Sequence, residues 1–134
     1  MDFSFLEPYR PQLLSLLRIF TGLLLFQYGV AKILKFPVLP YFANIPPLIT
    51  VAGTIELILG ALLIIGLFTR LSAFILSGQM AFAYFLGHVF KTGTPVWHPL
   101  NNGGTGAALF CFVCLYLASA GPGPWSVDAS RGKA

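Results

Sequence analysis

Charged residues are scarce in this chain. Its 134 residues include eight Lys or Arg and four Asp or Glu, so 9% of the chain is charged and 57% is hydrophobic. Soluble domains carry roughly 25% charged residues. Together with a mean hydropathy of +0.82, this shortfall excludes an ordinary soluble protein. The composition indicates an integral membrane protein, and the length suits one domain over residues 1–134.

Basic runs and a removable signal segment are also missing. No cluster of Lys and Arg is long enough to suggest nucleic-acid binding, although the formal net charge is +4. The opening stretch MDFSFLEPYRPQ contains two acids and two prolines, and no small-residue cleavage site follows a short apolar stretch. We therefore expect the first apolar segment to be retained as a membrane span.

Metal-binding residues are few. The chain has two histidines, His88 and His98, and two cysteines, Cys111 and Cys114. A metal site usually needs three or four suitable ligands, and no convincing third ligand lies close in sequence to a histidine. We therefore predict no metal site, and the chain also has no haem-attachment motif for a covalent cofactor.

Four apolar segments are long enough to cross a bilayer, which takes about 20 residues of helix. They cover approximately residues 12–34, 48–68, 71–89 and 105–120. Proline and glycine mark two of the gaps, and the stretch FTR leaves room only for a tight turn between the second and third segments. We predict an all-α fold, a bundle of four transmembrane helices packed up-down-up-down.

An even number of spans places both termini on one side of the membrane. The terminal side carries four basic residues and the other side two: Arg10, Arg70, Arg131 and Lys133 against Lys35 and Lys91. Positive residues favour the cytoplasmic side. We therefore expect cytoplasmic termini.

One carboxylate, Glu56, lies in the middle of the apolar stretch AGTIELILGALLIIG. Steps of three and four residues place Gly53 and Gly60 on the same helix face as Glu56. Glycines let a neighbouring helix approach closely, so Glu56 is expected to face the bundle interior. Lys32, near the end of the first span, is within reach, and we predict a Lys32–Glu56 ion pair.

The third span carries two polar stripes. Tyr84 and His88 lie on one of them, and Gln79 lies on the other. A straight helix cannot turn both stripes toward one cavity. Because His88 is expected near the same membrane side as Lys32, we predict that the Tyr84 stripe joins Lys32 and Glu56.

The two cysteines form a C-x-x-C pattern, Cys111-Phe-Val-Cys114, inside the fourth span. In redox proteins this pattern works at a helix N-terminus, where free amides stabilise a thiolate. An apolar position within a span favours the thiol instead. We interpret both cysteines as part of a small-residue packing seam, with dithiol chemistry as the alternative.

Three stretches resemble the DoxX family of small bacterial four-helix membrane proteins. They are LLRIFTGLLLFQYGVAKI, IELILGALLIIGLFTRLSAFILSGQMAFAYFLGH and NNGGTGAALFCFVCLYLASAGPGPWSVD. The resemblance implies a location in the bacterial inner membrane. The family takes its name from a subunit of a thiosulfate:quinone oxidoreductase, and other members have been linked to redox homeostasis or quinone resistance.

Four polar positions of the family correspond to residues of this chain: Lys32, Glu56, Arg70 and His88. Its NGG and GPGPWSVD motifs correspond to residues 102–104 and 121–128. Two departures stand out. Many relatives have a histidine where this chain has Tyr28, and an acid where it has Thr105, so any proton or metal chemistry that depends on those residues would be missing here.

The GPGPWSVD segment is expected to lock one end of the bundle. Its prolines cannot continue a helix, and Trp125 suits the membrane interface. Asp128 could pair with Arg70, because both are expected on the terminal side. We interpret these residues, with Asn102 of the NGG motif, as structural.

The predicted cluster of Lys32, Glu56, Tyr84 and His88 has two interpretations. It either orients the helices, or it forms a proton-coupled site for a quinone. The sequence lacks a flavin or nucleotide fingerprint, so electrons would have to come from a partner. The resemblance and the cluster predict a redox-linked, quinone-handling subunit. The alternative is a non-catalytic accessory subunit of a larger membrane complex or homo-oligomer, and a transporter is less favoured.

Overall fold

The computed structural model describes residues 3–34, 47–86, 97–98 and 104–132. Every regular element within these ranges is helical, which confirms the all-α fold. In chain order the elements are the 3-10 helix η1 (Ser4–Tyr9), α1 (Arg10–Gly29), the π-helical turn η2 (Val30–Leu34), α2 (Pro47–Ile65), α3 (Thr69–Tyr84), α5 (Thr105–Ala120) and the short α6 (Val127–Ser130).

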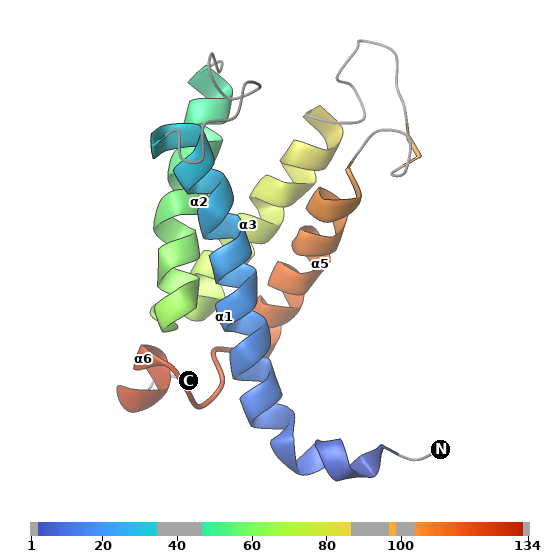
Figure 1. Ribbon diagram of the computed structural model, residues 1–134, viewed down its shortest axis with the longest axis vertical. Helices are drawn as coiled ribbons and strands as arrows, with labels where there is room; N and C mark the ends of the chain where they lie inside the picture. Colours follow the sequence, from blue (N-terminus) through green and yellow to red (C-terminus); the bar gives the residue numbers. More distant parts are fainter. Residues whose placement is uncertain (1–2, 35–46, 87–96, 99–103, 133–134) are drawn as a thin grey trace.

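The four long helices form two antiparallel pairs (Figure 1). Helix α1 packs mainly against α2, and α3 packs mainly against α5, while α2 and α3 join the two pairs. Both chain termini lie at the lower end of the bundle in Figure 1. The order of the helices is therefore up-down-up-down.

The tight turn predicted between the second and third spans is present, but it lies earlier in the chain than expected. We expected helices over 48–68 and 71–89, whereas α2 ends at Ile65 and α3 begins at Thr69. Gly66 and Phe68 have φ angles of 75° and 51°, in the left-handed region, which ends one helix and starts the next. Residues 87–89 of the third predicted span lie outside the described residues.

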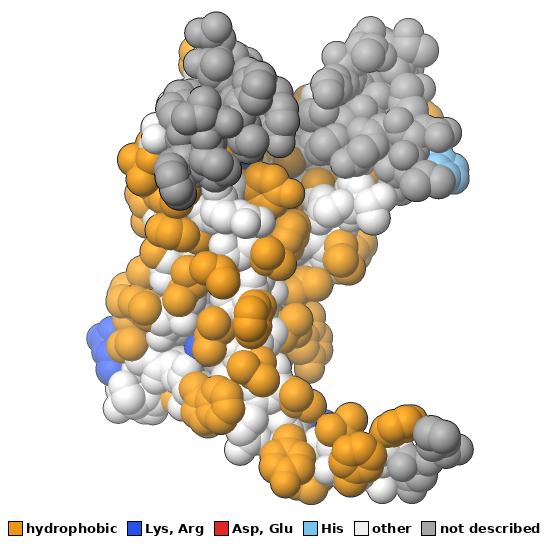
Figure 2. All heavy atoms as spheres, viewed as in Figure 1, with side chains coloured by type: hydrophobic (Ala, Val, Ile, Leu, Met, Phe, Trp, Pro, Cys, Tyr) orange, Lys and Arg blue, Asp and Glu red, His pale blue; other side chains and the backbone are white. Residues whose placement is uncertain are grey.

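The surface of the bundle is more apolar than the surface of a typical soluble protein. The segments Ser4–Leu34 and Pro47–Ile65 are long and apolar enough to cross a membrane, and Thr105–Ala120 is apolar but shorter. Large hydrophobic side chains cover the outside of the bundle (Figure 2), including Phe82 and Phe112, which are 69% and 68% exposed. Such an extended apolar surface is typical of contact with lipid.

Glycines allow the backbones of α1 and α2 to touch, as the position of Gly53 and Gly60 predicted. A Cβ atom added to Gly29 would lie 2.5 Å from the backbone nitrogen of Leu57, and one added to Gly60 would lie 2.9 Å from that of Phe26. Backbone atoms cannot move aside as a flexible side chain can. The α1–α2 contact therefore depends on the missing side chains.

We predict that Gly29→Ala destabilises the bundle by about 1–3 kcal/mol, because the added methyl group overpacks the α1–α2 contact. The matched control is Gly78→Ala, since a Cβ atom at Gly78 on α3 meets nothing within 4 Å. Thermal unfolding midpoints in detergent measure both changes. Equal midpoints for the two variants would contradict the direct backbone contact.

Candidate functional site

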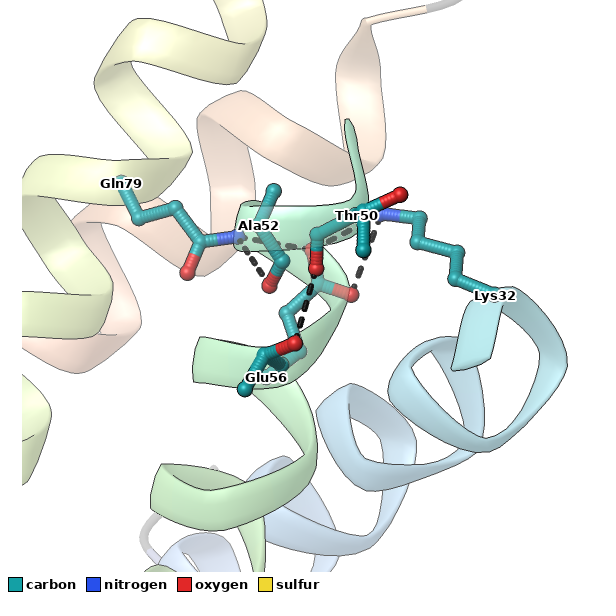
Figure 3. Close-up of polar contacts among 6 residues, drawn as sticks. Lys32, Thr50, Ala52, Glu56 and Gln79 are labelled. Atoms are coloured by element: carbon teal, nitrogen blue, oxygen red, sulfur yellow. Dashed lines mark hydrogen bonds and ion pairs between the residues drawn. The ribbon is translucent and has the colours of Figure 1, made fainter. Parts of the chain in front are cut away.

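The predicted ion pair joins α1 to α2 through η2. The Nζ atom of Lys32 lies 2.8 Å from Oε1 and 3.1 Å from Oε2 of Glu56. The side chain of Glu56 is 3% exposed and that of Lys32 is 15% exposed. A Cβ atom on Gly53 would come within 2.8 Å of the Lys32 Cβ atom. Gly53 therefore leaves room for the lysine stem. Figure 3 shows the Lys32 side chain extending toward Glu56.

Lys32 lies in the π-helical turn that ends the first span. Turns of this kind widen the helix by one residue and occur frequently at functional sites. The Nζ atom of Lys32 also lies 5.8 Å from the centre of the Tyr28 ring, within the range of a cation–π interaction. The ammonium group of Lys32 thus contacts both the Glu56 carboxylate and the Tyr28 ring.

Gln79 of α3 completes the cluster, and the sequence prediction missed it. Its Nε2 atom donates hydrogen bonds to Glu56 Oε1 at 2.7 Å and to the Ala52 carbonyl at 3.3 Å. Figure 3 shows Gln79 and Lys32 approaching Glu56 from opposite sides. Glu56 is therefore bound from both neighbouring helices.

The predicted orientation of α3 toward Glu56 was wrong. Ser77, on the stripe of Tyr84, donates a hydrogen bond to the Cys111 carbonyl of α5 at 2.8 Å. The Tyr84 hydroxyl donates to the Trp97 carbonyl at 2.8 Å. This stripe thus faces α5, which leaves the Gln79 stripe to face α2. His88 and Asn102 lie outside the described residues.

One polar atom of the cluster lacks a partner. The Oε1 atom of Gln79 is buried and has no hydrogen-bond partner among the described residues. The orientation of the amide, assigned from its neighbours, follows from two acceptors, the Glu56 carboxylate and the Ala52 carbonyl, that both require the nitrogen. A buried acceptor without a donor costs about 1–3 kcal/mol. A ligand hydroxyl or a water at this position would remove that cost.

The arrangement suits the binding of a polar group and the transfer of a proton. Lys32 presents a cationic donor, Glu56 can take up or release a proton, and Gln79 presents an acceptor. Ionisable residues within membrane helices commonly mark such sites. The described residues include no group of three or more His, Cys, Asp or Glu close enough to hold a metal ion.

The two cysteines lie on the side of α5 that packs against α3. Cys114 is buried and Cys111 is half-buried, and both are free thiols. The Sγ atom of Cys111 is 3.6 Å from the Ser77 hydroxyl. Cys114 belongs to the hydrophobic core together with Leu117. These positions favour the packing interpretation.

The GPGPWSVD segment crosses the terminal end of the bundle and is bound by Arg18. This arginine is fully buried, and its guanidinium donates to the carbonyls of Pro122 and Trp125, both at 2.7 Å. Ser15, also on α1, accepts a hydrogen bond from the Trp125 amide at 3.1 Å. This role of Arg18 was not predicted from the sequence.

The predicted pairing of Arg70 with Asp128 was wrong. The Asp128 carboxylate accepts the backbone amides of Phe68 at 3.0 Å and Thr69 at 2.9 Å, at the start of α3. Arg70 instead donates to the carbonyls of Ala118 and Ser119 at the end of α5. Each charge thus binds a helix end of opposite polarity.

The same contacts set the protonation of Asp128. Burial by itself raises the pKa of this carboxyl, but the hydrogen bonds from Thr69 and Phe68 and the charge of Arg131 outweigh burial. The net result is a pKa below the ordinary value. Asp128 therefore stays ionised near neutral pH and keeps both amides bonded.

A model of the DoxX family matches residues 13–89, the range that contains Lys32, Glu56 and Gln79. An uncharacterized protein of Haemophilus influenzae is 43% identical over 126 residues, which cover 92% of this chain and 93% of the relative. No solved structure matches this chain.

The Asp128 contacts predict an acid-dependent stability. Because the folded pKa lies below that of an unfolded Asp, near 3.9, the contribution is fully present above about pH 4. It is lost as the pH falls through the folded value. Asp128→Asn should lower the free energy of unfolding at pH 7 by about 1–2 kcal/mol, as for other lost caps. The change is measured as a lower thermal midpoint at pH 7 and a flatter decline of the midpoint in acid. Glu7→Gln, at an exposed position, is the control and should change neither. An unchanged acid profile in Asp128→Asn would contradict this role.

Proposed function

Since the chain belongs to the DoxX family of membrane proteins, we propose that it handles a quinone at the site formed by Lys32, Glu56 and Gln79. In this proposal it is a redox-linked subunit of the bacterial inner membrane, its termini face the cytoplasm, and a partner supplies the electrons. His88, which lies outside the described residues, stays a proposed contributor from the sequence, whereas Tyr84 is left out because its stripe faces α5.

The unpartnered Oε1 atom of Gln79 is the observation that carries the proposal. A quinone carbonyl is an acceptor, whereas a quinol hydroxyl is a donor. Lys32 Nζ can donate to the first, and Gln79 Oε1 can accept from the second. One site therefore offers complementary partners to both forms of the ligand.

The ion pair gives this site a proton route. Reduction of a quinone to a quinol takes up two electrons and two protons. In the oxidising direction, a quinol hydroxyl bound at Gln79 releases its proton to the Glu56 carboxylate, while the Lys32 ammonium stabilises the phenolate that remains. The low dielectric of the membrane interior strengthens this stabilisation. The two electrons then pass to the partner, and the proton of the second quinol hydroxyl is released to water, so that both protons and both electrons are accounted for.

The second candidate is a non-catalytic accessory subunit, or one chain of a homo-oligomer. Its support is the apolar outer surface in Figure 2, which a larger membrane complex could cover as well as lipid. In that case the Lys32–Glu56–Gln79 cluster holds α1, α2 and α3 together and binds no ligand. The two candidates differ in whether Gln79 Oε1 receives a donor.

Binding of decylubiquinol and decylubiquinone by the purified protein in lipid nanodiscs tests the proposal. We predict saturable binding of the quinol that Gln79→Leu weakens about tenfold, the effect of losing one buried hydrogen bond. Glu56→Gln should weaken it as well. The matched control is Thr54→Val on α2, because the Thr54 hydroxyl bonds only the Thr50 carbonyl of its own helix, at 2.9 Å.

Two results would count against a quinone at this site. One is a Gln79→Leu variant that keeps the wild-type thermal midpoint and binds the quinol as tightly as Thr54→Val. The other is wild-type protein that binds no quinone saturably but is recovered from native membranes with a large partner complex. The second result would favour the accessory subunit.

A further inference from the structure

A hollow lies at the opposite end of the molecule from the Lys32 cluster. It has a volume of about 560 Å³ and opens between the first turns of α1 and the last turns of α5. Its lining is mostly apolar and includes Arg10, Leu13, Leu14, Leu17, Tyr116 and Ala120. Along α1, Arg10 and Lys32 are separated by about 33 Å, at 1.5 Å per residue, so the α1–α5 groove is a separate site.

The groove exists because the fourth seam of the bundle is open. Helix α1 packs mainly on α2, and α5 packs mainly on α3, so the first and last long helices share little direct contact. Leu13 and Leu17 remain 45% and 40% exposed. A chain of methylene groups would cover apolar side chains that the protein itself does not cover.

Arg10 places a positive charge in the lining of the groove. It is exposed, and no ion pair joins it to another of the described residues. It also begins α1, where the positive end of the helix dipole disfavours a cation. Three of the other four Lys or Arg residues in the described ranges, Arg18, Lys32 and Arg70, have the hydrogen-bond partners given above. The fourth, Arg131, lies 5.9 Å from the centre of the Phe68 ring. Among the described residues, Arg10 is therefore the cation that lines the groove, and no ion pair among them neutralises it.

The N-terminal arm indicates the depth of the groove in the membrane. Residues 3–9 leave the bundle sideways at its lower end (Figure 1), and apolar side chains cover the arm (Figure 2). Phe3, Phe5 and Tyr9 are 56%, 63% and 57% exposed. Exposed aromatic residues beside a membrane span are typical of the headgroup level. Arg10, the next residue, then lies where phosphate groups are found.

We propose that the α1–α5 groove binds an anionic phospholipid. The acyl chain packs along Leu13, Leu14 and Leu17, and the phosphate binds the Arg10 guanidinium. Basic pockets between membrane helices bind anionic headgroups in the same way. This site does not depend on the quinone site, because the two lie at opposite ends of the bundle.

Native mass spectrometry of the protein released from nanodiscs tests the proposal. The nanodiscs contain equal amounts of palmitoyl-oleoyl phosphatidylglycerol and palmitoyl-oleoyl phosphatidylcholine. We expect wild-type protein to retain one phosphatidylglycerol in preference to phosphatidylcholine, and Arg10→Gln to lower its retention about fivefold. Arg10→Lys should keep the retention, and Ala120→Phe, which fills the groove, should lower it. Arg131→Gln, another exposed cation, is the matched control.

Three outcomes would overturn the proposal. The first is equal retention of the two lipids by wild-type protein. The second is the same loss of phosphatidylglycerol in Arg131→Gln as in Arg10→Gln, which would indicate general attraction to the surface. The third is a lipid-free dimer that Ala120→Phe abolishes, which would make a second copy of the chain the occupant. Thermal midpoints of all variants show whether each one folds.

Discussion

The backbone contact between α1 and α2 is the constraint on which the interior of this protein depends. Moving two charged groups out of water costs several kcal/mol for each, and close geometry must repay that cost. Gly53 provides the geometry, because its missing side chain leaves room for the stem of Lys32. The ion pair is therefore a consequence of the glycine positions. A wider spacing of α1 and α2 would leave the Glu56 carboxylate without its cationic partner and with only the Gln79 amide bonded to it.

At the terminal end of the bundle the charged side chains have a different kind of partner. There the charged side chains bind backbone groups and not one another. Asp128 accepts amides at the start of α3, Arg70 donates to carbonyls at the end of α5, and Arg18 donates to carbonyls of the closing segment. Helix ends and turns leave such groups without partners, and at the buried side chains of Arg18 and Asp128 water has little access to replace them. Charge is used here to complete the backbone hydrogen bonding.

Much of the fold could be predicted from the sequence, since hydropathy and periodicity are local properties. The stripe of Gly53, Glu56 and Gly60 defined an inward face, and the length of a lysine side chain made the ion pair predictable. The rotation of α3 was not predictable, because Gln79 and Tyr84 lie on competing faces and packing against α5 decides between them. The partners of Arg70 and Asp128 were missed for another reason. Free backbone amides and carbonyls occur with every residue type, so the sequence does not mark where they are. Matching opposite charges therefore does not identify them as partners.

The capping of α3 by Asp128 also bears on the order in which the molecule is assembled. The acceptor for the backbone amides of Phe68 and Thr69 is the Asp128 carboxylate, which lies 60 and 59 positions later in the chain. Synthesis proceeds from the N-terminus, so α2 and α3 are complete long before that carboxylate emerges from the ribosome. Until then the turn between them has no side chain to hold its left-handed Phe68. The α2–α3 hairpin therefore reaches its final stability only after residue 128 has been translated and has docked.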